Sequence, residues 1–324
     1  MTDSTPLLEL RGLTVGLAST PAVNIVDGVD LVIGRGERVA LVGESGSGKS
    51  VTARAIMRLD PTMRLTGEVV FDGRDLVPLK TREMAKLRGS SIAMVFQDPL
   101  RSLNPVMTIG AQVAEPLIIR GMPKRDALAR AREILDQLGV TNVADRMKAY
   151  PFEFSGGMRQ RVALAIALAA EPRLLIADEP TTALDTRMQE KVLSLLDRIA
   201  AERELSVLLI THDLGVVAGF ADRVAVMYAG RKIEDAPVDA LYANPLHPYT
   251  RGLLEAVLRI DRDVVELAAM PGTPVRPDAR PAGCAFAPRC AVKTAVCEIE
   301  VPALRVAASG TRSVACFVAN VEAA

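Results

Sequence analysis

The fold of this 324-residue chain is decided by the stretch Gly43-Glu44-Ser45-Gly46-Ser47-Gly48-Lys49-Ser50. An apolar run, Val39–Val42, leads into it, and a helical pattern follows it. The octet has the form G-x-x-x-x-G-K-[ST], whose glycines let successive backbone N–H groups turn inward around a polyphosphate. The helix that follows adds the positive end of its dipole. The stretch therefore predicts a phosphate-binding loop, with Lys49 reaching the β/γ-phosphates and the Ser50 hydroxyl holding Mg²⁺.

Strand and helix patterns alternate on both sides of this loop. The expected strands are Leu7–Val15, Ile25–Ile33, Glu37–Val42, Gly67–Phe71, Ile92–Phe96, Leu174–Ala177, Val207–Thr211 and Val224–Tyr228. Helical patterns cover Lys49–Leu59, dominate from Gln97 to Ala170, notably over Lys124–Leu138 before the helix-ending Gly139, and return at Thr186–Arg203. Such alternation predicts an α/β fold with a largely parallel sheet, into which the helical block is inserted. After Asn244 the prolines cluster, which indicates a separate, loop-rich tail.

Composition and charge exclude several classes of protein. The 39 basic and 39 acidic side chains cancel, so no global basic field is available to hold nucleic acid or an anionic membrane. The longest apolar run, Val162–Ala170, is about half of the ~20 residues that a membrane-spanning helix needs. The acidic N-terminus, Met1–Gly12, lacks the pattern of a secretory signal. We therefore expect a cytosolic protein, or one that sits at a membrane through partners.

A second candidate for chemistry is the apolar run Leu174–Ala177, which ends in Asp178 and Glu179. Carboxylates at the carboxyl end of a parallel strand face the ligand crevice. Asp178 is placed to bind Mg²⁺, and Glu179 to polarise an attacking water. A strand followed by Asp-Glu is a weak signal alone, but it is a strong one downstream of a phosphate loop.

Three further positions have both a functional and a structural interpretation. Ser155-Gly156-Gly157 begins a helical pattern. The segment is either an anion-binding site or an ordinary serine N-cap. His212 follows an apolar strand and could contact a γ-phosphate or orient water, although a lone histidine is more often structural. The Gln97 amide could reach the metal or the water, or could cap its own loop.

In this order the pieces resemble the ATP-binding cassette (ABC) ATPases over residues 7–245. The matching motifs are Walker A at Gly43–Ser50, the Q-loop Gln97, the signature Ser155–Gln160, Walker B at Leu174–Glu179, the D-loop Ala183–Asp185 and the switch His212. The resemblance implies a P-loop NTPase core, residues 1–245, with an N-terminal antiparallel β part and an inserted helical signature subdomain at about 98–165. A small C-terminal domain, residues 246–324, would follow it.

The same resemblance implies ATP and Mg²⁺ as cofactors and assigns roles to the motif residues. Ser50, Gln97 and Asp178 would hold the metal. The catalytic residues would be Glu179, His212, Gln97 and Lys49. Val51 would join Gly43–Ser50 in the ATP site. Family members pair head to tail, so each ATP lies between one subunit's Walker A and the other's signature. The residues that act in trans would be Ser155, Gly156, Gly157 and Gln160, with Asp185 in the D-loop.

Five segments narrow the resemblance to the ATPases of dipeptide and oligopeptide importers. They are Gln97–Pro99, Ser102–Pro105, Ala177–Asp185, Asn244–Thr250 and Gly283–Cys290. Met158 makes the signature similar to that of the first-type ATPase of a heteromeric pair. The implied partners are a homologous second ATPase, two membrane permeases and an extracytoplasmic solute-binding protein. The implied location is peripheral, on the cytoplasmic face of the cytoplasmic membrane. Nickel, glutathione and microcin importers share these features, so the solute stays open.

All four cysteines, Cys284, Cys290, Cys297 and Cys316, lie in the last 41 residues, spaced C-x5-C-x6-C-x18-C. The tight C-x2-C pairs of common zinc sites are absent. The tail resembles that of importer ATPases that bind a [4Fe–4S] cluster. The resemblance implies such a cluster here, held by the four cysteine thiolates. Zinc and unligated thiols are the alternatives.

The rival function, a DNA-repair or ribosome-associated cassette protein, is disfavoured by the single cassette and neutral charge.

Overall fold

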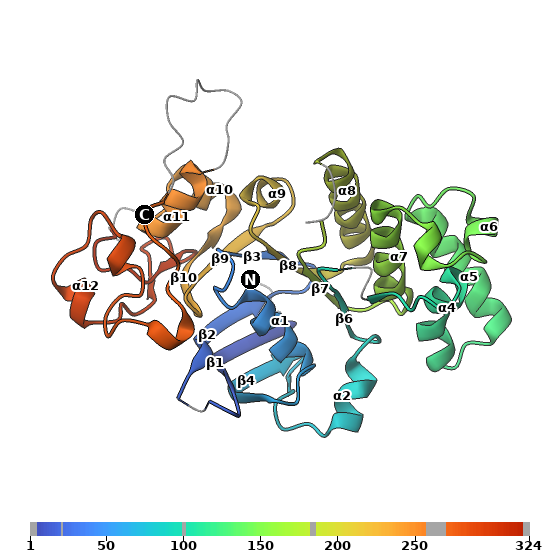
Figure 1. The fold of residues 1–324 in the computed structure, drawn as a ribbon, viewed down its shortest axis with the longest axis horizontal. Helices are drawn as coiled ribbons and strands as arrows, with labels where there is room; N and C mark the ends of the chain where they lie inside the picture. Colours follow the sequence, from blue (N-terminus) through green and yellow to red (C-terminus); the bar gives the residue numbers. More distant parts are fainter. Residues whose placement is uncertain (1–4, 21, 99–101, 182–185, 257–269, 320–324) are drawn as a thin grey trace. The chain divides into compact units, whose positions relative to one another are not determined.

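The computed structural model of the chain describes residues 5–20, 22–98, 102–181, 186–256 and 270–319 (Figure 1). Its packing divides the chain into two units. Unit 1 comprises residues 1–33, 38–78 and 210–324, and unit 2 comprises residues 34–37 and 79–209. Among the residues so described, no helix is both long and apolar enough to cross a membrane.

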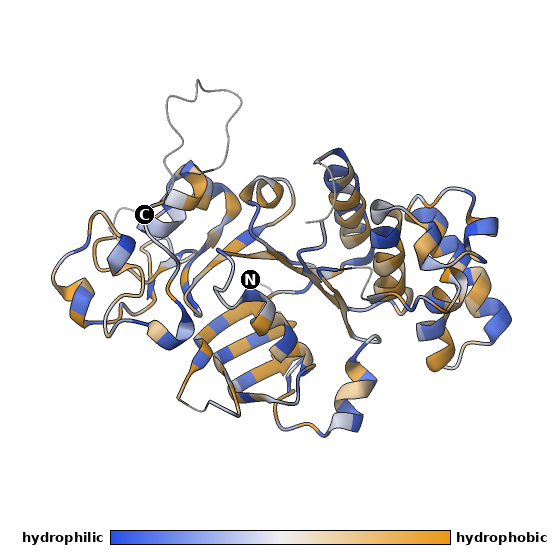
Figure 2. Cartoon of the chain, viewed as in Figure 1, coloured by the Kyte–Doolittle hydropathy of each residue, from blue (hydrophilic) through white to orange (hydrophobic). Residues whose placement is uncertain are grey.

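Unit 1 contains an antiparallel sheet with the strand order β2-β1-β4-β5. Its strands are β1 (Leu8–Leu17), β2 (Asn24–Ile33), β4 (Met63–Phe71) and β5 (Arg74–Asp75). Apolar and polar residues alternate along β1 and β2, which Figure 2 shows as orange and blue bands. Leu8, Leu10 and Val15 are buried on the inner face, as expected for a sheet with one covered side. The predicted N-terminal antiparallel part is confirmed.

A second set of strands in unit 1 carries the phosphate loop. β3 (Arg38–Val42) pairs in parallel with β9 (Arg223–Tyr228), which pairs with β10 (Arg231–Pro237) in antiparallel fashion. The short strands β12 (Ser313–Val314) and β11 (Arg305–Val306) continue this arrangement beyond β10. The helices of unit 1 are α1 (Lys49–Met57), α9 (Leu214–Ala218), α10 (Val238–Ala243), α11 (Pro248–Glu255), α12 (Val296–Ile299) and the 3-10 turns η2 (Pro277–Ala279) and η3 (Ala287–Arg289).

Strand β10 was not among the strands expected from the sequence. Its sequence, Arg-Lys-Ile-Glu-Asp-Ala-Pro, is charged, yet Glu234 is fully buried. The Glu234 carboxylate accepts hydrogen bonds from the backbone N–H groups of Leu246 and His247, at 2.8 and 2.9 Å. Charge is tolerated there because a buried carboxylate is stable when hydrogen-bonded. In the structure Ala229 and Gly230, both with positive φ, form the tight turn that joins β9 to β10.

Unit 2 contains the remaining parallel strands and the helical block. β6 (Ile92–Val95) pairs in parallel with β7 (Leu174–Asp178), and β8 (Ser206–Thr211) lies beside β7. Every residue of β7 and β8 is buried, as in strands covered on both faces. The helices are α2 (Thr81–Leu87), α4 (Ile109–Ile119), α5 (Lys124–Gln137), α6 (Val143–Arg146), η1 (Pro151–Glu153), α7 (Gly156–Ala169) and α8 (Thr186–Arg203).

Helix α5 illustrates how the helical pattern was correctly predicted. Ala127, Ala131, Ile134 and Leu135 are buried, at the spacing of one helix face. The helix ends just before Gly139, which has a φ of 70° and so takes the left-handed conformation typical of a C-terminal glycine.

The segment after Asn244 is anchored to unit 1 by aromatic rings. Tyr228 of β9, Tyr249 of α11 and Phe286 form a cluster with ring centroids 4.7–5.5 Å apart. Such pairs add stability beyond their buried area. Next to them His247 is 2% exposed, and its Nδ1 accepts a hydrogen bond from the Tyr249 backbone N–H, which caps α11.

Burial lowers the pKa of His247 to about 3, so this residue makes stability depend on pH. An unfolded histidine has a pKa of about 6.5, and the unfolded chain therefore gains a proton first as pH falls. We expect the free energy of unfolding to fall below pH 6.5, with this one group contributing about 2 kcal/mol by pH 5. The matched variant is His247→Asn, which keeps an acceptor for the helix N-terminus. Denaturant unfolding at pH 7.5 and pH 5 should show a smaller pH effect in the variant, and an equal effect in both proteins would contradict this role.

Candidate functional site

The phosphate loop joins β3 to α1 as predicted. Gly43 has a φ of 151°, and a Cβ built on it would lie 2.2 Å from the Met227 carbonyl oxygen of β9. Only glycine allows the loop to approach β9 this closely. On the same side, the Gly230 N–H donates to the Ser47 carbonyl at 2.9 Å. The turn between β9 and β10 thus fixes the outer side of the loop.

Lys49 is buried and holds the loop from inside. It is 4% exposed, and its Nζ donates to the carbonyl oxygens of Gly43 at 2.7 Å and Glu44 at 3.0 Å. An ammonium group held within this loop, at the N-terminus of α1, favours the binding of a polyphosphate. Ser50 follows as the second residue of α1.

Glu44, the second residue of the loop, is bound by groups from the C-terminal part of unit 1. Its backbone N–H donates to the Tyr249 hydroxyl at 2.8 Å. Its carboxylate accepts two hydrogen bonds from the Arg289 guanidinium, at 2.7 and 3.0 Å. Paired parallel bonds of this kind are among the strongest polar contacts in proteins. The tail is therefore attached to the loop itself.

The two histidines have different environments. His247 is the buried, structural one, whereas His212 lies at the end of β8 with its side chain exposed. Next to it Asp213 caps α9, accepting from the Gly215 N–H at 2.8 Å. An exposed histidine at a strand end suits contact with a ligand better than a core role.

In unit 2 the structure brings two predicted residues together. Gln97, just beyond β6, donates from Nε2 to Glu179 Oε2 at 2.6 Å. Asp178, the last residue of β7, is 1% exposed, whereas Glu179 is half-buried. Glu179 has a φ of 47°, a strained conformation for a non-glycine residue. Such strain is most often found at functional sites, where the surroundings hold it in place.

The signature segment begins α7, also in unit 2. Ser155 is its N-cap and accepts a hydrogen bond from the Met158 N–H at 3.4 Å, as the plainer interpretation predicted. Gly156 is exposed and Gly157 is buried against Met188. Within the described residues, the Nε2 of Gln160 is buried without a hydrogen-bond partner. Asp185 of the predicted D-loop lies outside the described residues.

The cysteines lie in the tail. Cys297 and Cys316 are buried, Cys284 and Cys290 are half-buried, and all four are free thiols. Burial raises the pKa of the Cys284 and Cys316 thiols. In the part of the chain that is described, no three His, Cys, Asp or Glu side chains are arranged to hold a metal ion. The structure therefore does not show the expected metal cluster.

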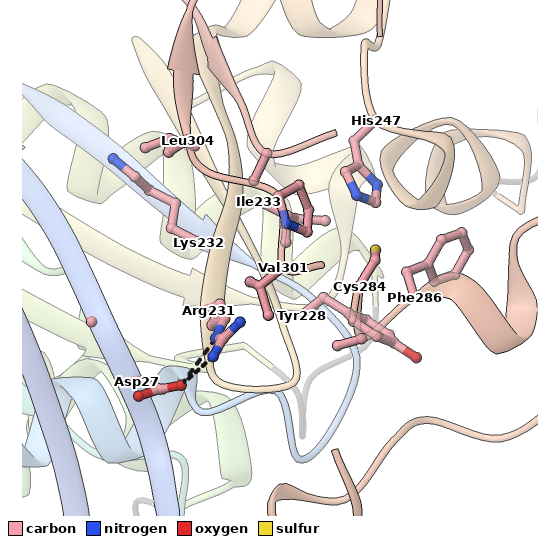
Figure 3. A pocket seen from close by; sticks show the side chains of 14 residues that line it. Asp27, Tyr228, Arg231, Lys232, Ile233, His247, Cys284, Phe286, Val301 and Leu304 are labelled. Carbon is pink, nitrogen blue, oxygen red and sulfur yellow. Dashed lines mark hydrogen bonds and ion pairs between the residues drawn. The ribbon is translucent and has the colours of Figure 1, made fainter. Parts of the chain in front are cut away.

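A cavity of about 310 Å³ lies in unit 1 beside the cysteine tail (Figure 3). His247, Cys284 and Phe286 line it together with apolar residues of the tail. Its charged members are already paired: Asp27 with Arg231 at 2.7 Å, and Lys232 with Asp235 at 2.8 Å. No residue of the phosphate loop contributes to this lining, so the cavity is separate from the loop.

Sequence reasoning missed two residues that bear on the site, Tyr249 and Arg289. Both lie in segments noted for their resemblance, but their contacts with Glu44 span 205 and 245 residues. No local pattern indicates a pairing at that separation.

Comparison with protein families gives two matches. A family described as "ABC transporter" matches residues 26–182, and one described as "Oligopeptide/dipeptide transporter, C-terminal region" matches residues 233–297. The chain is 47% identical to the oligopeptide transport ATP-binding protein AppD of Bacillus subtilis, over 98% of each chain. It is 48% identical to a Brucella abortus protein named "Putative peptide import ATP-binding protein", over 90% of this chain and 89% of that protein.

Solved structures give a consistent result. The ATP-binding cassette MJ0796, in a dimeric post-hydrolysis state bound to ADP and Pi, is 32% identical with a TM-score of 0.65. It covers 71% of this chain and 98% of its own. CbiO1 from Clostridium perfringens, part of the ABC transporter complex cbiONQ, is 26% identical with a TM-score of 0.65 and covers 74% of this chain and 91% of its own.

Proposed function

Since the chain belongs to the ABC transporter family, as an ATP-binding subunit of the peptide importers, we propose that it couples ATP hydrolysis at a dimer interface to peptide uptake. The chain is an ABC-type ATPase. The observation that carries the proposal is the phosphate loop with its buried Lys49, in a chain matching a peptide-transport relative from end to end.

Within the nucleotide site we propose the following roles. Lys49 and the loop amides bind the β- and γ-phosphates, as their inward-facing cation and glycine turns favour. Ser50, Gln97 and Asp178 supply the oxygen atoms that Mg²⁺ prefers, and the buried carboxylate of Asp178 gives the charge. Mg²⁺, when bound, neutralises charge on the phosphates.

Hydrolysis then depends on residues that position water and stabilise charge. We propose that Glu179 polarises the attacking water and that Gln97, its hydrogen-bond partner at 2.6 Å, orients it. His212, exposed at the end of β8, contacts the γ-phosphate. Such a site works by positioning and electrostatics, with little covalent chemistry from the protein.

The signature completes the site of a facing subunit. Ser155 and the glycines after it present N–H groups at the start of α7, a 14-residue helix. The buried, unpartnered Nε2 of Gln160 favours a role for this helix start beyond capping. As the resemblance implies, we propose that Asp185 of the D-loop acts beside them and that Val51 joins Gly43–Ser50 in the ATP site. Family membership implies dimerisation and membrane permease partners.

The finer assignment of partners is also a proposal. We propose a homologous second ATPase, two permeases and an extracytoplasmic solute-binding protein, at the cytoplasmic face of the cytoplasmic membrane. The names of the relatives favour peptides over nickel, glutathione or microcin-like solutes. Capture of permeases in a pull-down would support this assembly, whereas capture of ribosomes or DNA would support a non-transport cassette protein.

We propose further that the four cysteines bind a [4Fe–4S] cluster in the complete assembly. Backbone N–H groups of Phe286 and Ala287 at Cys284, and of Val318 and Ala319 at Cys316, oppose the rise that burial causes in the pKa of these two thiols. Hydrogen bonds from backbone N–H groups stabilise thiolates and tune clusters. No part of the proposed hydrolysis depends on this cluster.

The variant Glu179→Gln tests the role of this carboxylate in hydrolysis. Glu179→Gln keeps the shape and removes the charge that activates water, so hydrolysis should slow by about 10²-fold or more. ATP affinity should stay near the wild-type value, whereas Lys49→Ala should lose ATP binding. Turnover is measured on the complex with its companion ATPase and permeases. Normal turnover of Glu179→Gln would remove Glu179 from this role, and a wild-type complex that ignores Mg-ATP would refute the function.

The iron content of the purified protein tests the proposed cluster. Protein purified without oxygen should be brown and contain about four irons per chain. Substituting Cys297 by Ser should remove the iron and the colour. A colourless, iron-free protein with four titratable thiols would contradict the cluster and leave the ATPase assignment intact.

A further inference from the structure

Every polar group of Glu44 is bound by a different part of unit 1. Its N–H donates to Tyr249, its carbonyl accepts from Lys49, and its carboxylate accepts from Arg289. Tyr249 is fully buried and Arg289 is 7% exposed, so both partners are held in place. The position of Glu44 is thereby determined from three directions.

Arg289 is itself fixed by its surroundings. Its Nε donates to the Pro271 carbonyl at 2.8 Å, and its guanidinium carbon lies 5.9 Å from the ring centroids of Tyr228 and Phe286. A planar guanidinium in such a frame is already oriented for two parallel bonds to a carboxylate. A lysine at this position would supply charge but not the paired geometry.

The charge of Glu44 would otherwise oppose the function of the loop. The side chain belongs to the octet that cradles phosphates, and an unpaired carboxylate there would repel a triphosphate. The guanidinium of Arg289 lies 2.7 Å from one carboxylate oxygen and 3.0 Å from the other, and so cancels that charge. The loop therefore relies on a cation supplied from 245 residues further along the chain.

We propose that Arg289 is a positioning residue of the nucleotide site, which neutralises Glu44 and orders the phosphate loop for ATP. The inference rests on the proposed function. It gives the tail, in which Arg289 lies between Cys284 and Cys290, a direct effect on ATP affinity.

The test is the Kd of a fluorescent ATP analogue for the full-length chain, with Mg²⁺. Arg289→Met should weaken binding by about tenfold or more, because it leaves the carboxylate unpaired. Arg289→Lys should lie between Arg289→Met and wild type. Arg276→Met, at an exposed arginine of the same tail, should bind like wild type.

A double variant distinguishes charge from packing. Glu44→Gln combined with Arg289→Met removes both charges and should recover binding to within about threefold of wild type. Unfolding midpoints show whether each variant is folded, and recovery in the double variant shows that the loss of Arg289 is compatible with a folded site.

The proposal is overturned if Arg289→Met binds as wild type does, or if the double variant is as weak as Arg289→Met. Should Arg289→Met fail to fold, Arg289→Lys decides, since equal affinity of Arg289→Lys and wild type contradicts the need for paired bonds. If the wild-type chain itself binds no ATP analogue, the proposed function fails rather than this inference.

Discussion

The structure depends on one constraint: a loop that turns its amides inward has to be held from outside. The loop after β3 achieves this by contact with neighbours distant in sequence. Gly43 packs against the Met227 carbonyl, the Ser47 carbonyl accepts from Gly230, and Glu44 is bound to Tyr249 and Arg289. A preorganised ring of donors loses little free energy to reorganisation when an anion binds.

This constraint explains why the last third of the chain is built as it is. The rings of Tyr228, Tyr249 and Phe286 join β9, α11 and the cysteine segment into one cluster. Buried Glu234 ties β10 to the start of α11 through two backbone N–H groups. A loop-rich segment with little core of its own is thus ordered by contacts with the strands that flank the phosphate loop.

Much of this architecture could be predicted from the sequence, because its signals are local. Apolar runs gave β3, β7, β8 and β9 to within a residue or two at each end, and Gly139 marked the end of α5. The octet fixed the phosphate loop because strand, glycines, lysine and helix are contiguous. The plainer interpretation of Ser155 as an N-cap also proved correct in the structure.

The remainder could not be predicted, since it depends on pairings between distant segments. Strand β10 was missed because its sequence is charged. The cost of burying the Glu234 carboxylate is offset by hydrogen bonds from two backbone N–H groups, which follow it by more than ten residues. The pairing of Gln97 with Glu179 was not foreseen as a hydrogen bond, although each residue was singled out. The pairing of Arg289 with Glu44 could not be predicted, because no local pattern in the sequence links two residues so far apart.

The central claim is that the C-terminal segment holds the phosphate loop, and amide hydrogen exchange at Glu44 tests it directly. In the wild-type chain we expect the Glu44 amide to be protected, and Tyr249→Phe to accelerate its exchange while β3 stays protected. Exchange of Glu44 at the rate of an unstructured peptide, or no change in Tyr249→Phe, would contradict the account.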